Sequence, residues 1–200
     1  MNRTHSEHPL NVLLIEHDQA KASAVMQALG TQDYHITHVS SGGLALLKVV
    51  DENQPDLIIM DVESPDRDMV ESLNQMSQIN PKPIVMFSEQ GDTETIHSLV
   101  KSGVSAYIVG DVDAARVKSI VDIAMVRFTE YQELKNELLE TKKKLTSQKT
   151  IEQAKIWLME TKQLTEKEAY HRMRKMAMDN GQTIDEVAKN LLSVAAMLDL

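Results

Sequence analysis

Short apolar runs alternate with amphipathic segments along the first two-thirds of the chain. An apolar run of four to six residues recurs five times, as NVLLIE (11–16), HITHVS (35–40), LIIMD (57–61), PIVMF (83–87) and AYIV (106–109). A segment of helical period follows each run, and the last of these segments begins near Asp113. Mostly apolar strands that alternate with helices are typical of a parallel sheet covered on both faces. We therefore predict a doubly wound α/β domain with a five-stranded parallel sheet over residues 10–127.

Polar side chains stand where these predicted strands end. Three consecutive polar residues close the first strand, and Asp61 closes the third, with three further acids in the next seven positions. The carboxyl ends of parallel strands meet at one edge of such a sheet, where sites form. Carboxylates this close together destabilise a fold unless a cation, a phosphoryl group or a partner uses them. The candidate site residues are Glu16, His17, Asp18, Asp61, Ser88 and Gly110.

The helix that follows the fifth strand has no evident end before Lys149, because the chain from Asp113 to that point contains neither Gly nor Pro. Residues of the two seams of a heptad pattern are Val117, Ala124, Tyr131, Leu138 and Leu145, with Val121, Phe128, Lys135 and Lys142. We predict a coiled-coil linker over residues 121–149, continuous with the last helix of the first domain, that pairs two copies of the chain. The alternative is a long solvated connector that packs on its own domain.

Residues 150–200 lack strand-like alternation and predict a small all-α domain of three helices. These helices span Ile151 to about Thr161, Glu166 to about Asp179, and Ile184 to about Leu198. Thr165 and Thr183 are the predicted N-caps, since a hydroxyl there can accept from a free backbone N–H of the first turn. The predicted bundle core consists of Ile156, Met159, Ala169, Met173, Met176, Ala177, Val187, Leu191 and Val194.

Composition narrows the function classes. The chain has no Cys, no apolar run of the roughly 18 residues that span a bilayer and no signal-peptide core near its start, so we expect a cytoplasmic protein with a flexible segment over residues 1–9. The net charge is −9, which disfavours nucleic-acid binding by the chain as a whole. Residues 1–127 hold 18 Asp/Glu against 9 Lys/Arg, whereas residues 150–200 hold 8 against 7. The C-terminal third can therefore present a local basic face.

Residues 10–127 resemble the receiver domain of response regulators. In that family the acid that ends the third strand accepts a phosphoryl group, and the resemblance therefore implies that Asp61 is a phosphoacceptor. It also implies that Glu16 and Asp18 hold Mg²⁺ together with Asp61, and that Ser88 contacts the phosphoryl group.

Two departures from the receiver pattern weaken this site. The adjacent acid pair of the family is Glu16-His17 here, with Asp18 displaced by one position, and Gly110 stands where the family carries Lys. Losing that cation removes a charge-assisted hydrogen bond worth about 1.5–3 kcal/mol. We expect a vestigial pocket, or one occupied only by Mg²⁺, within a protein-binding platform that requires no cofactor. A working phosphorylation switch remains the alternative.

The C-terminal segment resembles the ANTAR domain of transcription antitermination regulators. The matching residues are Ala154-Lys155, Leu158-Met159, Leu164-Thr165, Glu168-Ala169, Arg174-Lys175-Met176-Ala177 and Val187-Ala188. Together with ESPDRD (63–68) and GVSAYIV (103–109), they make the chain similar to the NasT-like regulators of nitrate assimilation. The resemblance implies binding to paired hairpins of a leader RNA, which prevents a terminator from forming. It further implies control by a nitrate- or nitrite-sensing protein partner, and a homodimer suits two hairpins.

Cations and an aromatic residue of the last domain are the candidate RNA contacts. They are Lys155, Lys162, Tyr170, Arg172, Arg174 and Lys175. Lys and Arg can bind loop phosphates, and an exposed aromatic ring can stack on a splayed base. The alternatives are that Tyr170 lies in the core and that the arginines pair with nearby acids. Because Arg174 and Lys175 are adjacent on a helix, we expect them to differ in exposure.

Three other function classes compete with RNA binding. A DNA-binding response regulator would use the helices around NGQT (180–183) as a helix-turn-helix, but the last helix opens with two acids and offers only Lys189, so duplex DNA is not the expected ligand. A phosphatase would use Asp61 and Glu63 as nucleophile and general acid. The spacing and the single α/β domain disfavour it, and we expect no enzyme activity. A scaffold that binds only protein is the third reading.

Overall fold

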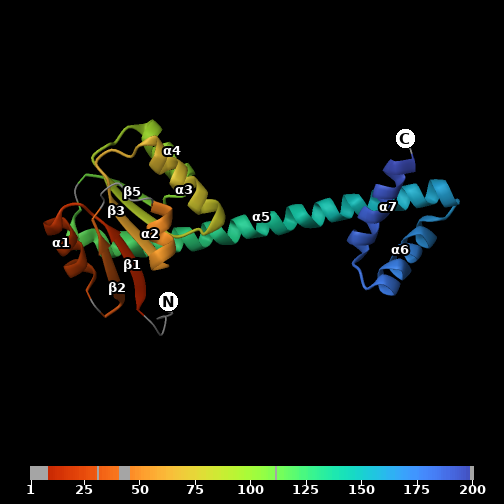
Figure 1. Cartoon of the computed structure of the whole chain (residues 1–200), viewed down its shortest axis with the longest axis horizontal. Coiled ribbons are helices and arrows are strands. Elements are labelled where there is room, and N and C mark those ends of the chain that lie inside the picture. The colour runs from red at the N-terminus through yellow and green to blue at the C-terminus, as the bar shows by residue number, and fades with distance from the viewer. Residues whose placement is uncertain (1–8, 31, 41–45, 111, 199–200) are drawn as a thin grey trace. The chain divides into compact units, whose positions relative to one another are not determined.

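A computed structural model describes residues 9–30, 32–40, 46–110 and 112–198 of the chain (Figure 1). The predicted flexible start lies outside the described residues, apart from Pro9. Strands and helices follow in the order β1 (Leu10–Ile15), α1 (Gln19–Leu29), β2 (Tyr34–Val39), α2 (Leu46–Asn53), β3 (Leu57–Asp61), α3 (Arg67–Ile79), β4 (Ile84–Ser88), α4 (Thr93–Lys101), β5 (Ala106–Val109), α5 (Ala114–Lys162), α6 (Glu166–Asn180) and α7 (Ile184–Leu198). The chain divides into two compact units, Met1–Gln132 and Glu133–Leu200.

The first unit is the predicted α/β domain. Its five strands are all parallel and lie in the order β2-β1-β3-β4-β5. Strand β1 therefore lies between β2 and β3, so the chain first adds β2 on one side of β1 and then β3, β4 and β5 on the other side. This arrangement creates a topological switch point at the carboxyl ends of β1 and β3, the place where open α/β sheets bind ligands. The predicted fold class is confirmed.

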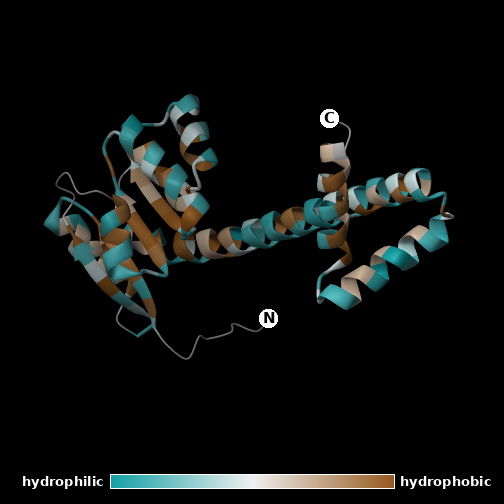
Figure 2. Ribbon diagram, turned by 45° about the vertical axis from the view of Figure 1, so that its right-hand side comes forward, coloured by the Kyte–Doolittle hydropathy of each residue, from teal (hydrophilic) through white to brown (hydrophobic). Residues whose placement is uncertain are grey.

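Helices cover both faces of the sheet, as the apolar strands require. One face packs against α1 and α5, and the other packs against α2, α3 and α4. Alternate residues of each strand serve the two cores: Leu14 points to the first face, whereas Leu13 points to the second. The strands are the most hydrophobic segments of this unit, whereas the helices mix apolar and polar residues (Figure 2).

Helix α5 begins inside the core of the first unit. Val117, Val121 and Ala124 are buried against the sheet, so these positions of the predicted coiled-coil seam belong to the domain itself. The prediction that these residues pair with a second chain is therefore wrong. A helix that covers a sheet and a helix that pairs with another helix both carry apolar residues at heptad spacing, so the spacing alone does not distinguish them. Further along α5 the apolar side chains are exposed, at Tyr131, Leu134, Leu138, Leu139 and Leu145.

The expected boundary at residue 150 falls within this continuous helix. The predicted helix from Ile151 to Thr161 is the last part of α5, because the backbone remains α-helical without interruption from Lys149 to Lys162. The second unit is thus a three-helix bundle of the C-terminal part of α5, α6 and α7. No helix among the described residues is long and apolar enough to cross a membrane.

The core of the bundle differs in part from the prediction. Ala169, Met173, Ala177 and Val187 are buried as expected, with Met159, Met176 and Leu191 packed at the edge. Ile156 and Val194 are exposed instead, because each lies on the side of its helix that faces away from the bundle. Their places are taken by Ala154, Leu158, Ala188 and Ala195, which are buried. The three alanines among them allow the helices to approach closely.

Both predicted N-caps are confirmed by reciprocal hydrogen bonds. The backbone N–H of Thr165 donates to Glu168 Oε2 at 2.9 Å, while the Glu168 N–H donates to Thr165 Oγ1. Thr183 and Glu186 form the same pair of bonds at the start of α7. Each capping box satisfies two backbone donors that a helix start would otherwise leave free.

Candidate functional site

The pocket at the switch point is built around two acids from neighbouring strands. Glu16 directly follows β1 and Asp61 ends β3, and these strands pair side by side. A lysine that the sequence analysis did not single out completes the pocket. Lys21, in the first turn of α1, places Nζ 3.3 Å from Asp61 Oδ2. The side chain of Asp61 is only 13% exposed, whereas that of Lys21 is 37% exposed, so the carboxylate is shielded and the ammonium side remains open to water.

Glu16 is the most deeply buried acid of the pocket, with 4% of its surface exposed. Its Oε1 accepts a hydrogen bond of 2.7 Å from the backbone N–H of Asp18, while its buried Oε2 has no hydrogen-bond partner among the described residues. Burial raises the pKa of the Glu16 carboxyl, and the nearby charge of Asp61 raises it further. His38 Nε2 donates to the Glu16 carbonyl at 2.9 Å and helps to fix the strand end.

Asp18 lies at the rim of the pocket, where one of its carboxylate oxygens caps a helix. It is the N-cap of α1, and its Oδ1 accepts from the backbone N–H groups of Ala20 and Lys21 at 2.7 and 3.1 Å. These backbone hydrogen bonds hold the pKa of the Asp18 carboxyl below its usual value. His17 is exposed beside it. The displacement of this acid by one residue from the family position therefore converts a metal-ligand candidate into a helix cap.

Of the acids that follow β3, one caps a helix and two are exposed. Asp66 is the N-cap of α3, with its Oδ1 accepting from the Met69 N–H at 2.8 Å. Glu63 and Asp68 are exposed. Glu63, the second acid of the phosphatase alternative, lines the same pocket as Asp61, but its side chain is exposed while that of Asp61 faces Lys21.

Ser88 and Gly110 close the other side of the sheet edge. The buried Ser88 hydroxyl donates to the Glu63 carbonyl at 3.2 Å and accepts from the Gln90 N–H at 3.2 Å. Gly110 has a φ of +101°, a backbone conformation that side chains with a Cβ rarely adopt, and its N–H donates to the Ser88 carbonyl. The loss of the family lysine is therefore accompanied by a backbone on which a lysine would be strained.

The residues of this pocket do not fit a Mg²⁺ ion. The orphaned Oε2 of Glu16 is a suitable oxygen ligand, but Asp18 is committed to the start of α1 and the ammonium group of Lys21 already faces Asp61. Within the described part of the chain, no three His, Cys, Asp or Glu side chains gather closely enough to hold a metal. Magnesium prefers near-octahedral oxygen ligands, and an ammonium group in the ligand shell is incompatible with that arrangement.

A cationic surface lies in the second unit, on the outer side of α6. Buried Ala169, Met173 and Ala177 define the inner side of this helix. A shallow depression on its outer side is lined by Lys167, Glu168, Tyr170, His171, Arg172, Arg174 and Lys175. We call this set the α6 face. Tyr170 is 43% exposed, so it is accessible for stacking. Arg174 and Lys175 are both exposed, which corrects the expectation that they differ.

The α6 face has little acid to offset its cations. Glu166 is paired with Lys155 on α5, and Glu168 is occupied in the capping box. Among the residues that the structure describes, no carboxylate forms an ion pair with Arg172, Arg174 or Lys175 (the salt bridges of this unit lie elsewhere). The alternative in which the arginines pair with nearby glutamates is therefore not observed. Lys167 and His171 belong to the same surface, and the recurrence of basic residues three and four positions apart is the signal that points to them.

Lys155 does not belong to this surface. Its side chain is 11% exposed, and its Nζ lies 2.7 Å from both Glu152 Oε2 and Glu166 Oε1. These bonds raise the pKa of the Lys155 ammonium and lower that of the Glu166 carboxyl. Lys155 thus ties α5 to the start of α6, while Lys162, at the end of α5, is exposed. Seven-residue spacing places two residues on one side of a helix, but here α6 covers only the first.

The last helix is a poor match to a DNA-recognition helix. Its exposed cation, Lys189, forms an ion pair of 2.6 Å with Asp185 on the same helix. That bond holds the pKa of Asp185 below its usual value and raises that of Lys189. Helix α7 therefore presents two acids at its start and a neutralised lysine, which disfavours entry into a major groove.

Family comparisons agree with both halves of this architecture. Residues 12–122 match the response regulator receiver domain, and residues 139–192 match the ANTAR domain. The chain is an ANTAR-domain response regulator. The ANTAR match begins within α5, eleven residues before the expected boundary at 150, because the end of that helix is the first helix of the domain. The predicted resemblance to this family, with a NasT-like order of domains, is confirmed.

Individual relatives add detail to this assignment. The transcriptional regulatory protein PdtaR of Mycobacterium tuberculosis is 26% identical over 184 residues, which cover 92% of this chain and 90% of the relative. The nitrate regulatory protein of Klebsiella oxytoca is 36% identical over 80 residues, or 40% of this chain and 20% of that protein. These relatives are transcriptional and nitrate regulators by name, not enzymes. Similar solved structures include the signal receiver domain of a modulated diguanylate cyclase from Desulfovibrio desulfuricans, with a TM-score of 0.51 and 18% identity. The similarity covers 62% of this chain and 99% of that one, and it supports the receiver fold alone.

Proposed function

We propose that this ANTAR response regulator is a transcription antitermination factor that binds paired hairpins of a leader RNA and prevents a terminator from forming. The observation that carries the proposal is the α6 face. Five basic side chains and an accessible tyrosine lie together there, and the glutamates of the same helix are used in structural bonds. Specific RNA recognition uses this combination, because cations bind loop phosphates and an aromatic ring stacks on an unpaired base.

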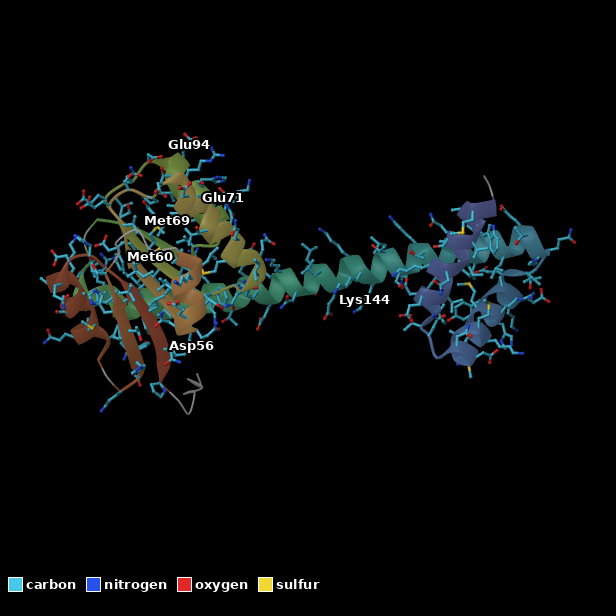
Figure 3. The ribbon with its side chains drawn as sticks, in the orientation of Figure 1. Asp56, Met60, Met69, Glu71, Glu94 and Lys144 are labelled. Atoms are coloured by element: carbon cyan, nitrogen blue, oxygen red, sulfur yellow. The ribbon has the colours of Figure 1, made fainter. Side chains whose placement is uncertain are left out.

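The charge distribution assigns separate tasks to the two units. The receiver unit carries the surplus of acid, and its outward side chains include Glu71 and Glu94 on α3 and α4, whereas Met60 of β3 lies inside it (Figure 3). An acidic surface repels RNA at long range and suppresses non-specific binding. The α6 face is then the RNA-binding element, and the receiver is the part that responds to a signal.

A homodimer suits a target with two hairpins. Beyond the receiver core, α5 exposes Tyr131, Leu134, Leu138 and Leu145, which recur at intervals of three, four and seven residues. That spacing forms a seam along which a second copy of α5 can pair. Two modest contacts joined in this way gain effective concentration for the second binding event. The proposed seam therefore starts after the residues that α5 contributes to the receiver core.

The signal is proposed to come from a protein partner. A nitrate- or nitrite-sensing protein that sequesters the regulator is the candidate, on the basis of the similarity to a nitrate regulatory protein. The receiver pocket supports control by a partner rather than by phosphorylation, since Asp61 is paired with Lys21 and a lysine at position 110 is absent.

The proposal is tested by titrating the full chain against a fluorescent leader RNA with two hairpins, a single-hairpin version and a duplex DNA of equal charge. We expect tight binding to the two-hairpin RNA, weaker binding to one hairpin and weak, unselective binding to DNA. Addition of the protein to a transcription reaction on the leader template should increase read-through. The proposal fails if the chain prefers duplex DNA or binds all three with equal affinity, and in that case a DNA-binding regulator takes its place.

A further inference from the structure

The receiver pocket contains its own cation. Lys21 comes from the first turn of α1, and its Nζ donates a hydrogen bond to Asp61 Oδ2 across forty positions of sequence. The Lys21 side chain is 37% exposed and that of Asp61 is 13% exposed, so the bond joins a surface stem to a shielded carboxylate. A lysine stem can lie along the protein while its charged end reaches such a site.

The acids of the pocket show why a cation is needed there. Glu16 and Asp61 lie at the carboxyl ends of neighbouring strands, and the charge of Asp61 contributes to the raised pKa of the Glu16 carboxyl, although burial is the larger cause. Two carboxylates this close repel each other unless a positive charge offsets them. The positive charge of Lys21 acts on both, since it opposes the rise in the pKa of Glu16 as well as binding Asp61.

The same pocket is poorly arranged for a divalent metal. Asp18 lies at the rim of the pocket, but its Oδ1 is used as the N-cap of α1, where it accepts from the backbone N–H groups of Ala20 and Lys21. The residue that follows the cap by three positions is Lys21 itself. The turn that uses one carboxylate oxygen of Asp18 as a helix cap therefore also brings the ammonium group of Lys21 to the pocket.

We propose that Lys21 is a built-in counter-ion of the receiver pocket, which neutralises Asp61 in place of a divalent cation and excludes Mg²⁺ from the site. The negative charge of Asp61 is then balanced by the ammonium group of Lys21 without a bound metal. This inference does not rest on RNA binding, and it holds whether or not the C-terminal unit is an antiterminator. It makes Lys21 a residue that determines the specificity of the pocket for its cation.

The chain offers a matched control for this lysine. Lys118 forms an ion pair with Asp33 that is also 3.3 Å long and also lies in the receiver unit. Both members of that pair are about half exposed, and neither lies at the carboxyl ends of the strands. Replacing Lys118 therefore changes the net charge of the unit by the same amount without altering the pocket.

Mn²⁺ binding to the full-length protein tests the proposal. Mn²⁺ is a suitable probe because it binds oxygen ligands much as Mg²⁺ does and is measured directly by electron paramagnetic resonance. We expect weak binding by the wild type and by Lys118→Met, and binding roughly ten- to hundredfold tighter in Lys21→Met, since a unit charge is removed from beside the ligands. Lys21→Arg keeps the charge and should bind Mn²⁺ as weakly as the wild type.

Additional variants locate the site and protect against misfolding. Asp61→Asn in the Lys21→Met background should abolish the gained affinity, which places the metal at this carboxylate. Lys21→Gln provides a second neutral variant, and a thermal melt identifies any protein that fails to fold. Equal Mn²⁺ affinity in the wild type and Lys21→Met would overturn the proposal, as would the absence of any gain in both folded neutral variants. A gain of the same size in Lys118→Met would overturn it as well, because net charge alone would then be responsible.

Discussion

Neutralising two cations of the α6 face should change how RNA binding depends on salt. Arg174→Ala combined with Lys175→Ala removes two exposed charges that have no ion-pair partner among the described residues. Because neither side chain contributes to the buried core of the bundle, the variant is expected to fold as the wild type does. Its effect on RNA binding should therefore be electrostatic.

The size of the effect follows from counterion release. Each phosphate contact contributes about 0.7 to 0.9 to the slope of log affinity against log salt concentration. If both residues contact phosphates, the slope falls by roughly 1.4 to 1.8 for one module, and by about twice that in a dimer that binds two hairpins. For one module, the loss of affinity relative to the wild type should then be about tenfold larger at 50 mM than at 200 mM salt.

The assay is a fluorescence-anisotropy titration of the two-hairpin RNA at several salt concentrations. The control is Lys143→Ala combined with Lys144→Ala, which removes the same charge from two adjacent exposed lysines of α5 (Lys144 is labelled in Figure 3). We expect the control to keep the wild-type slope. If the α6 variant keeps the wild-type slope, or if the control loses as much of it, then the α6 face is not the principal phosphate-binding surface.

Four further predictions concern the core, the ion pairs and the dimer. Met173→Ala empties a fully buried site of the bundle and should cost about 2–5 kcal/mol of unfolding free energy, measured by urea denaturation; a loss below about 1 kcal/mol would contradict this packing. Lys155 holds the pKa of Glu166 below its usual value of 4.5, so this bond stabilises the bundle above that pH and the contribution is lost as pH falls through the lowered pKa. Thermal melts of Glu166→Gln should lack that part of the acid sensitivity, and an identical pH profile would refute the linkage. Leu138→Lys should shift the proposed dimer towards monomer in sedimentation, without altering the receiver core, and an unchanged mass would exclude this seam. Asp61→Asn should leave read-through on the leader template largely intact, and complete loss in a folded variant would establish Asp61 as an active switch.

The sequence was sufficient for features that depend on neighbours along the chain. Apolar strands and amphipathic helices determined the parallel sheet, and each capping box needed only residues three positions apart, as at Thr165 and Glu168. The place of Asp61 at a strand end also followed from the pattern, because parallel strands bring their carboxyl ends to one edge. Such features repeat with the period of a helix or a strand and can be read locally.

Other features were decided only when distant segments met. Heptad spacing could not tell that Val117 and Val121 face the sheet rather than a second chain, since both surroundings favour the same residues. Lys155 became a buried bridge because α6 folds back and brings Glu166 to it. Lys21 and Asp61 are forty positions apart in the sequence, and they meet because α1 follows β1, which pairs with β3. Ion pairs and burial of this kind depend on which distant elements pack together, and the local periodicity of the sequence does not determine that packing.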